Sequence, residues 1–298
     1  MTKAPQTGIA HEVAPGVRSV LAPNPSPMTH WGTNTYLVGE AEIAVIDPGP
    51  DDAAHLQAVL SATRGQTISH ILVTHAHLDH APLAARLAAR TGAQVMGFGA
   101  AHDGRSTIMA ELAAAGHTGG GEGVDSGFQP HTALRDTDTV QGADWALEVV
   151  ATPGHFSGHL SFAMGDILFS GDHVMGWSST LISPPDGDVR AFMSSCARLQ
   201  KRPERRFLAG HGAPIDTPAE RLEWLIAHRL EREAQILNAL GPEPQTIGDL
   251  AAQIYSDIPP RMLPVAARNL FAHLIDLTER NLAVATPELG FNAGYCSA

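Results

Sequence analysis

The sequence is poor in cysteine and in positive charge. Its 298 residues include 2 cysteines, Cys196 and Cys296, which lie far apart and outside any metal-binding spacing, so neither a disulfide scaffold nor a thiolate metal site is indicated. Lys and Arg total 19 against 31 Asp and Glu, which gives a formal net charge of −12. Such an acidic chain is unsuited to broad electrostatic capture of nucleic acid or an anionic membrane.

Long hydrophobic runs are also missing. Residues 1–15 lack the apolar core of a signal peptide, and no stretch approaches the roughly 18 apolar residues that a membrane-spanning helix requires. We therefore expect neither export nor membrane insertion, and the low cysteine content favours the reducing cytoplasm. The hydrophobic content of 44% is sufficient for a full core, and the length predicts two units of unequal size.

Hydrophobic periodicity predicts alternating strands and helices over the first two thirds of the chain. The βαβ order within this region implies parallel strand pairing. Strands are expected at 17–21, 35–38, 43–47, 68–74, 94–97, 145–151, 160–163, 167–170 and 206–209, and helices at 51–62, 82–90 and 189–199.

The composition changes near Pro218. Three helical patterns follow, at 219–240, 247–255 and 264–278, without strand alternation. We therefore predict a catalytic domain over residues 1–218 and a small, mainly helical domain over 219–298. Between two elements of the first domain, residues 116–128 hold six glycines and predict a mobile loop, either a lid over a site or a plain connection.

Histidine is abundant, with 16 residues, and some of these lie in tight groups. The segment His75-Ala-His77-Leu-Asp79-His80 follows a predicted buried strand, where α/β folds place their chemistry. Three imidazoles and a carboxylate this close together cannot all be satisfied in an apolar core. Imidazole nitrogens and carboxylate oxygens are the ligands that zinc and iron take. In an extended chain, His75 and His77 point the same way, while Asp79 and His80 can face a second ion.

Three further candidate ligands follow later strands, each in a turn that contains glycine. They are His155 after 145–151, Asp172 after 167–170, and His211 after 206–209. These residues follow the His-x-His-x-Asp-His segment in a fixed order. This order of candidate ligands along the chain resembles that of the metallo-β-lactamase-fold hydrolases. The resemblance implies a four-layer αββα sandwich, of α+β class, with one metal held by His75, His77 and His155. It implies that Asp79, His80 and His211 hold a second metal and that Asp172 bridges both.

The tail resembles the winged-helix extension of the β-lactamase-like protein 2 group, through the apolar periodicity of 228–240, 250–255 and 266–277. Winged helices often bind DNA, but six arginines against ten acidic residues after position 218 leave no basic stripe. We expect this domain to cover the catalytic domain or to form a contact between subunits. The basic cluster at 198–206 follows a predicted helix, where cations complement the helix dipole.

These features predict a binuclear zinc hydrolase, with iron or manganese as alternative metals. The nucleophile is then water activated by the metal pair and positioned by Asp79. No Gly-x-Ser-x-Gly motif offers a competing nucleophile. True β-lactamases of this fold carry a cysteine or no ligand at the position of Asp172, so antibiotic hydrolysis is not expected. A ribonuclease domain inserted before the last histidine does not fit between Asp172 and His211.

The substrate is expected to be a small ester, thioester or related acyl compound. A metal-dependent endoribonuclease acting on single-stranded RNA is the alternative, followed by an iron-dependent dioxygenase and a noncatalytic binding protein. Trp177, Ser178 and Ser179 follow Asp172 closely and are candidate substrate contacts. His159 and His173 are candidates for orienting a ligand or touching the substrate.

Overall fold

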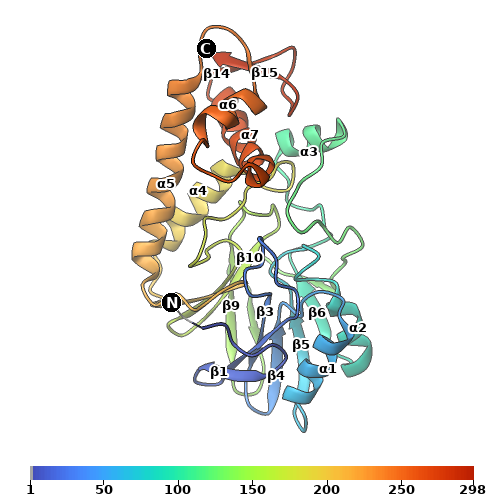
Figure 1. The fold of residues 1–298 in the computed structure, drawn as a ribbon. Coiled ribbons are helices and arrows are strands. Elements are labelled where there is room, and N and C mark those ends of the chain that lie inside the picture. Colours follow the sequence, from blue (N-terminus) through green and yellow to red (C-terminus); the bar gives the residue numbers. More distant parts are fainter. Residues whose placement is uncertain (1–2) are drawn as a thin grey trace.

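The computed structural model describes residues 3–298, and two stacked β-sheets form the lower half of the molecule (Figure 1). The first sheet has the order β1-β2-β3-β4-β5-β6-β7, with strands β1 (Ala10–Ala14), β2 (Val17–Leu21), β3 (Asn34–Val38), β4 (Glu42–Ile46), β5 (Thr67–Leu72), β6 (Gln94–Gly97) and β7 (Thr132–Ala133). The second has the order β12-β11-β10-β9-β8, with strands β8 (Thr139–Gln141), β9 (Ala146–Ala151), β10 (Leu160–Met164), β11 (Ile167–Gly171) and β12 (Arg206–Ala209).

Side-chain alternation along the strands divides the core into layers. In β3, Tyr36 and Val38 pack between the two sheets, against Phe162 and Phe169 of the second sheet. Leu37, between them in the sequence, points to the opposite face and joins the cluster beneath the helices. Because both faces of β3 are covered, all five of its residues are buried. The continuous apolar run that predicted this strand follows from that double burial.

Helices cover the outer face of each sheet and complete the predicted four-layer αββα sandwich. Helices α1 (Ala53–Ala62) and α2 (Leu83–Thr91) connect the parallel strands β4, β5 and β6 and pack on the first sheet. Helix α4 (Val189–Leu199) packs on the second sheet. The side chain of Asp52 caps α1 by accepting a hydrogen bond from the backbone N–H of His55.

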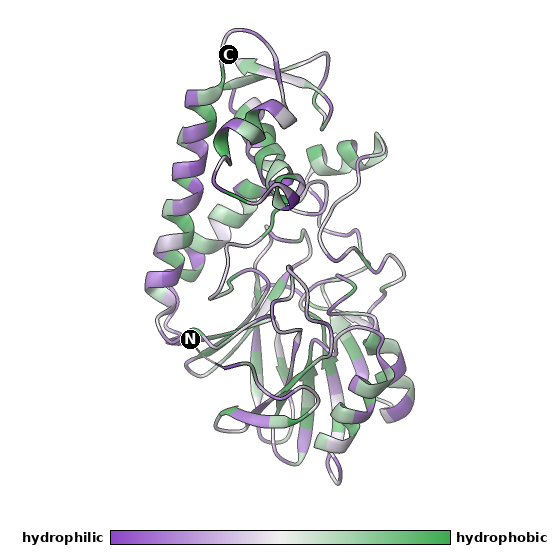
Figure 2. Cartoon of the chain, viewed as in Figure 1, coloured by the Kyte–Doolittle hydropathy of each residue, from purple (hydrophilic) through white to green (hydrophobic). Residues whose placement is uncertain are grey.

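The C-terminal region contains helices α5 (Pro218–Ala239), α6 (Ile247–Ile254) and α7 (Leu263–Glu279), as predicted. The region is mainly helical, as predicted, and it also contains short strands that the sequence pattern did not indicate. A small sheet of order β13-β15-β14 pairs β13 (Gln245–Thr246), β14 (Ala283–Thr286) and β15 (Gly294–Ser297). These strands have at most four residues each, too few to show a period of two. Figure 2 shows hydrophilic and hydrophobic residues alternating along α5, as expected for a helix with one packed face.

The C-terminal helices share a hydrophobic core with the sandwich. Leu222 and Leu225 of α5 are fully buried against Phe192 and Cys196 of α4, and Ala272 of α7 lies in the same cluster. The predicted domain boundary at residue 218 therefore precedes a helix that packs directly on the catalytic region. We propose that residues 1–218 and 219–298 are two fold units and that they share this core.

Other differences between expectation and structure are local. The strand β1 and the helix α3 (Thr107–Ala114) were not predicted, since neither has a clear hydrophobic period. The predicted strand at 68–74 ends two residues earlier, at Leu72. Over residues 3–298, no helix has the length and hydropathy needed to cross a membrane.

Candidate metal centre and its cavity

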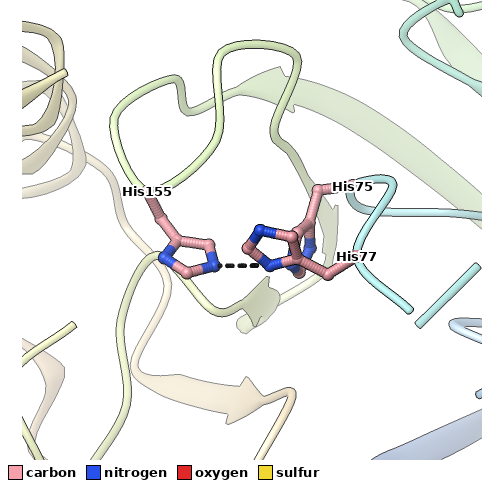
Figure 3. Close-up of side chains that lie close together, drawn as sticks. All are labelled: His75, His77 and His155. Carbon is pink, nitrogen blue, oxygen red and sulfur yellow. Dashed lines mark hydrogen bonds between the residues drawn. The ribbon is translucent and has the colours of Figure 1, made fainter. Parts of the chain in front are cut away.

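Three histidines converge above the end of β5. Nδ1 of His77 lies 2.9 Å from Nε2 of His75 and 3.1 Å from Nε2 of His155 (Figure 3). His75 and His77 come from the segment that follows β5, whereas His155 comes from the turn after β9. All three side chains are buried. The structure therefore brings together the three residues predicted to hold one metal.

Four more predicted ligands form a second cluster beside the first. Nε2 of His211 lies 3.0 Å from Oδ2 of Asp79 and 3.3 Å from both Oδ2 of Asp172 and Nε2 of His80. Asp172 also lies 3.7 Å from Nε2 of His155, which belongs to the first cluster. Within each cluster the possible ligand atoms all lie within 4.8 Å of one another. Asp172 thus stands between the two clusters, at the place expected of a bridging carboxylate.

Outer hydrogen bonds fix the orientation of these imidazoles. Nδ1 of His155 donates to the carbonyl of Leu181 at 2.7 Å, and Nδ1 of His211 donates to the carbonyl of Gly32 at 3.1 Å. Nδ1 of His75 donates to Oγ1 of Thr74 at 2.9 Å. In His75 and His155, Nδ1 carries the only ring proton, so Nε2 presents a lone pair toward the first cluster. In His211, the contact with Gly32 directs Nε2 toward Asp79 and Asp172.

Asp47 is a functional residue that the sequence reasoning missed. Its carboxylate accepts from His80 Nδ1, from the Thr74 hydroxyl and from the Thr74 backbone N–H, each at 2.8 Å. Through Thr74 it also orients His75, so one carboxylate supports both clusters. The available signal was an aspartate at the carboxyl end of a buried strand, followed by Pro48 and Gly49. Its φ of +51° is a conformation that aspartate tolerates better than most residues.

Burial keeps the first cluster neutral. It lowers the pKa of His77 to about 3 and takes the pKa of His75 well below its ordinary value, and the neighbouring imidazoles add repulsion in the same direction. Burial also lowers the pKa of His155. Neutral imidazole is the form that binds metal, so these three side chains are ready to ligate at neutral pH.

The second cluster has the opposite balance. Burial disfavours charge on His80 and His211, but Asp79 and Asp172 outweigh it, which raises the pKa of His211 to about 10 and that of His80 well above its ordinary value. The same two imidazoles lower the pKa of both carboxyl groups against the effect of burial. Two buried carboxylates therefore require positive charge beside them, and a divalent cation supplies it.

The donor set fits a divalent metal site on two further grounds. Oδ1 of Asp79 and Oδ1 of Asp172 are buried and have no hydrogen-bond partner within residues 3–298, a costly state that coordination would relieve. The Nε2 lone pairs of His75 and His155 face Nδ1 of His77 at hydrogen-bond distance. Nitrogen and oxygen ligands without thiolate suit zinc, iron or manganese.

A cavity of about 330 Å³ opens from the two clusters toward the C-terminal helices. Trp177, Ser178 and Ser179 line it, at the positions expected for substrate contacts. Gly120, Gly121 and Glu122 of the glycine-rich loop line it as well. Backbone hydrogen bonds from Leu78 to Gly123 and from Asp125 to Ala76 hold this loop against the segment that carries the histidines. The loop therefore forms a wall of the cavity and is more than a connection.

His159 and His173 lie beneath the clusters and do not line the cavity. Nε2 of His159 accepts a hydrogen bond from the backbone N–H of Asp172 at 3.2 Å, while Nδ1 contacts Thr152 Oγ1 at 2.8 Å. His173 packs on Phe192 and lies 3.6 Å from Sγ of Cys196. Contact with substrate is therefore not proposed for either residue. His159 instead holds the backbone of Asp172 in place.

The basic cluster at 198–206 is engaged in ion pairs. Arg198 contacts Asp136, Arg202 contacts Glu148 and Glu204, and Arg206 contacts Asp216, all within 3.0 Å. These arginines do not line the cavity. Their charge is balanced locally, in agreement with a structural role.

Comparison with known proteins agrees with the geometry. The Metallo-beta-lactamase superfamily model matches residues 28–211, and the Beta-lactamase associated winged helix domain model matches residues 246–290. The chain is 31% identical over 271 residues to a protein of Drosophila melanogaster called Beta-lactamase-like protein 2 homolog, with 87% of this chain and 86% of that protein covered. It is 32% identical over 250 residues to the Atrochrysone carboxyl ACP thioesterase of Aspergillus fumigatus, with 80% and 70% covered.

Solved structures match over nearly the whole chain. A beta-lactamase domain protein from Burkholderia ambifaria superposes with a TM-score of 0.81 at 24% identity, covering 99% of this chain and 95% of that one. A metallo-beta-lactamase family protein from Thermus thermophilus superposes with a TM-score of 0.75 at 24% identity, covering 96% and 100%. At this identity the structures establish the fold, with the C-terminal region included.

Proposed function

We propose that this chain, which belongs to the metallo-beta-lactamase superfamily, is a binuclear zinc-dependent hydrolase of small acyl thioesters. Membership and the fold make it a metal-dependent hydrolase with a C-terminal winged-helix domain. We assign one metal to His75, His77 and His155, and the other to Asp79, His80 and His211. Asp172 would contact both. The observation that carries this assignment is the convergence of the two buried clusters at the floor of one cavity.

When bound, the metal pair supplies Lewis acidity, which lowers the pKa of water and polarises a carbonyl oxygen. The chain supplies position and proton handling. Asp79 would hold the metal through one carboxylate oxygen, and its other oxygen would accept a hydrogen bond from a water in the cavity and position that water. His159 fixes the backbone of Asp172, and Asp47 fixes His80, so the site keeps its shape during the reaction.

A thioester suits this site because its leaving group needs little help. Water adds to the acyl carbon, the carbon–sulfur bond breaks, and the products are a carboxylic acid and a thiol. A thiol with a pKa near 8.5 departs as the thiolate without a strong general acid. The cavity wall is largely apolar, with Tyr255, Met262 and Val265 on the C-terminal side, as an acyl chain requires. Relatives called Atrochrysone carboxyl ACP thioesterase support the same substrate class.

Outside the cavity, the distribution of charge gives no support for RNA binding. In a helix-turn-helix domain the second helix of the motif reads nucleic acid, and α7 has that place here. Ten residues of α7 are buried, from Ala266 to Leu277, so this helix packs inside the molecule. Three arginines of the basic cluster at 198–206, namely Arg198, Arg202 and Arg206, are engaged in ion pairs. A small molecule therefore remains the proposed substrate.

A substrate panel tests this proposal. The zinc-loaded protein is offered a butyryl thioester of N-acetylcysteamine, the matching oxygen ester and a single-stranded RNA oligonucleotide, each also with the Asp172→Ala variant. We expect thioester hydrolysis that is at least about tenfold faster than ester hydrolysis and is lost in the variant. RNA cleavage that is lost in the variant, without thioester hydrolysis, would overturn the substrate assignment.

A further inference from the structure

The cavity also has a polar lining that is not part of the metal clusters. Two arginines of α5, Arg229 and Arg232, line it together with His228. Tyr255, Met262, Val265 and Ala266 add an apolar surface from α6, the following turn and α7. One cavity thus joins the metal clusters on the catalytic domain to two guanidinium groups on the C-terminal helices.

Arg229 is a buried cation without an acidic partner. Its side chain is 3% exposed, and no carboxylate within residues 3–298 pairs with it. One nitrogen donates to Oδ1 of Asn269 at 3.0 Å, another donates to the carbonyl of Thr180, and Nε has no partner. Burial lowers the pKa of Arg229 to about 10, so the group remains charged at neutral pH. A buried charge with only neutral acceptors is costly, and an anion beside it would offset that cost.

Arg232 adds a second charge, which is partly exposed. Its guanidinium stacks over the ring of Tyr255 at 4.1 Å and donates to Gln235 and to the carbonyl of Ile254, and no carboxylate of the described chain pairs with it. In a chain of net charge −12, these two arginines place positive charge in the wall of the cavity. By contrast, Arg190 of α4 and Arg280, which follows α7, form ion pairs with Asp276 and do not line this cavity.

The acidic residues of the cavity do not neutralise these arginines. Asp79 and Asp172 belong to the metal clusters. Asp186 pairs with Arg105 at 2.6 Å, and Glu122 accepts a hydrogen bond from Ser26 at 2.6 Å. Arg229 and Arg232 therefore retain donors for a ligand.

We propose that Arg229 and Arg232 form an anion subsite that selects thioesters bearing a carboxylate or phosphate away from the scissile bond. This inference rests on the proposed function, because it assigns a further contact of the same substrate. Arg229, held by Asn269 and Thr180, supplies a fixed positive charge beside an oxyanion, and Arg232, held over Tyr255, supplies further donors. The apolar wall between this subsite and the metals would then contact the methylene or ring portion of the molecule.

Three thioesters distinguish where the anion lies. Hexanoyl N-acetylcysteamine carries none, adipoyl N-acetylcysteamine carries a carboxylate on the acyl part, and hexanoyl phosphopantetheine carries a phosphate on the leaving group. We expect one of the two anionic thioesters to have the higher kcat/KM in the wild-type protein. Arg232→Gln and Arg229→Lys should reduce that preference at least about tenfold, mainly through KM, because a charge-assisted hydrogen bond is lost.

Arg280→Gln is the matched control, since it removes a charge from the same helical region outside this cavity. It should leave the preference unchanged. An equal loss for neutral and anionic thioesters in the Arg229 and Arg232 variants would show a purely structural role and overturn the proposal. So would an unchanged preference, or a wild-type protein without any preference.

A binding measurement keeps this inference separate from the proposed function. Metal-free protein is titrated calorimetrically with adipate, and we expect binding that weakens at least about tenfold in Arg232→Gln and not in Arg280→Gln. If no thioester is hydrolysed but adipate binding depends on Arg232, the proposed reaction fails and the anion subsite stands. If adipate binds equally to all variants or to none, the subsite is wrong.

Discussion

Asp47 and His80 form a buried contact in which Oδ2 of Asp47 accepts a hydrogen bond from Nδ1 of His80 at 2.8 Å. The same carboxylate binds Thr74, whose hydroxyl accepts from His75. The two metal clusters are therefore not independent, because one side chain outside both of them sets ring orientation in each.

Replacing this carboxylate should weaken metal binding without unfolding the protein. Asp47→Asn keeps the shape and tolerates the φ of +51°, but it removes the charge that holds His80. We expect a loss of about 10-fold to 100-fold in metal affinity, measured by competition with a chromogenic chelator. Asp51→Asn, at an exposed position four residues later, serves as the control. Wild-type affinity in Asp47→Asn would contradict the role assigned to this residue.

The two clusters should respond differently to pH. The pKa of His211 is raised to about 10, so a metal must displace a proton from the second cluster at neutral pH. Its apparent affinity should rise about tenfold per pH unit for each proton displaced between about pH 7 and 9. The pKa of His77 is about 3, so the first cluster should show no such rise. Competition with a chelator at several pH values across this range measures the metal affinity of each cluster. If the metal affinities of both clusters stay constant across this pH range, the difference in charge assigned to the two clusters is wrong.

His273 in α7 should make the protein sensitive to acid. Burial lowers its pKa to about 3, with Arg229 and Arg232 adding repulsion, while the unfolded chain titrates near 6.5. Between these values the unfolded state binds one more proton, so stability is lost as pH falls from about 6.5 toward 3. His273→Leu should reduce the slope of unfolding free energy against pH by about 1.4 kcal/mol per unit in this window.

The same substitution should not destabilise the protein at neutral pH, because Nε2 of His273 is buried without a hydrogen-bond partner in the described chain. Urea unfolding of both proteins at several pH values provides the comparison. An identical slope in the variant would mean that His273 is accessible to protons in the folded state.

The shared core between α4 and α5 should make the two regions unfold together. Leu225 is fully buried in this cluster, and Leu225→Ala should cost about 2–5 kcal/mol. Calorimetry should show one transition that shifts as a whole. Leu230→Ala, at an exposed position of the same helix, should change little. Two transitions, of which only one shifts, would show that residues 1–218 fold independently of the rest.

The site was largely predictable because its residues carry strong local signals. Histidine and aspartate at the ends of apolar strands, in a fixed order along the chain, indicated all seven residues that the structure brings together in the two clusters. Local sequence could not reveal Asp47, whose importance depends on contacts with residues 27 and 33 positions away. It also could not show that Arg229 faces the metal cavity, since that follows from packing α5 on the sandwich.

The elements of the fold also differ in how well the sequence predicted them. Strands buried on both faces, such as β3 and β4, were evident from apolar runs. Strands β13, β14 and β15 were not, because they are short and β13 pairs with a segment about fifty residues away. The glycine-rich loop is placed by hydrogen bonds to Ala76 and Leu78, and the amino-acid composition of the loop does not indicate these contacts.

Metal titration of the purified protein tests the central claim most directly. Chelated, metal-free protein is given increasing equivalents of zinc while hydrolysis of butyryl N-acetylcysteamine is recorded, with Asp172→Ala as the control. We predict negligible activity without metal, a maximum near two equivalents, and a loss of at least about 1000-fold in the variant, comparable to other losses of essential catalytic groups. Full activity without metal, a maximum at one equivalent, or an active Asp172→Ala protein would contradict this prediction.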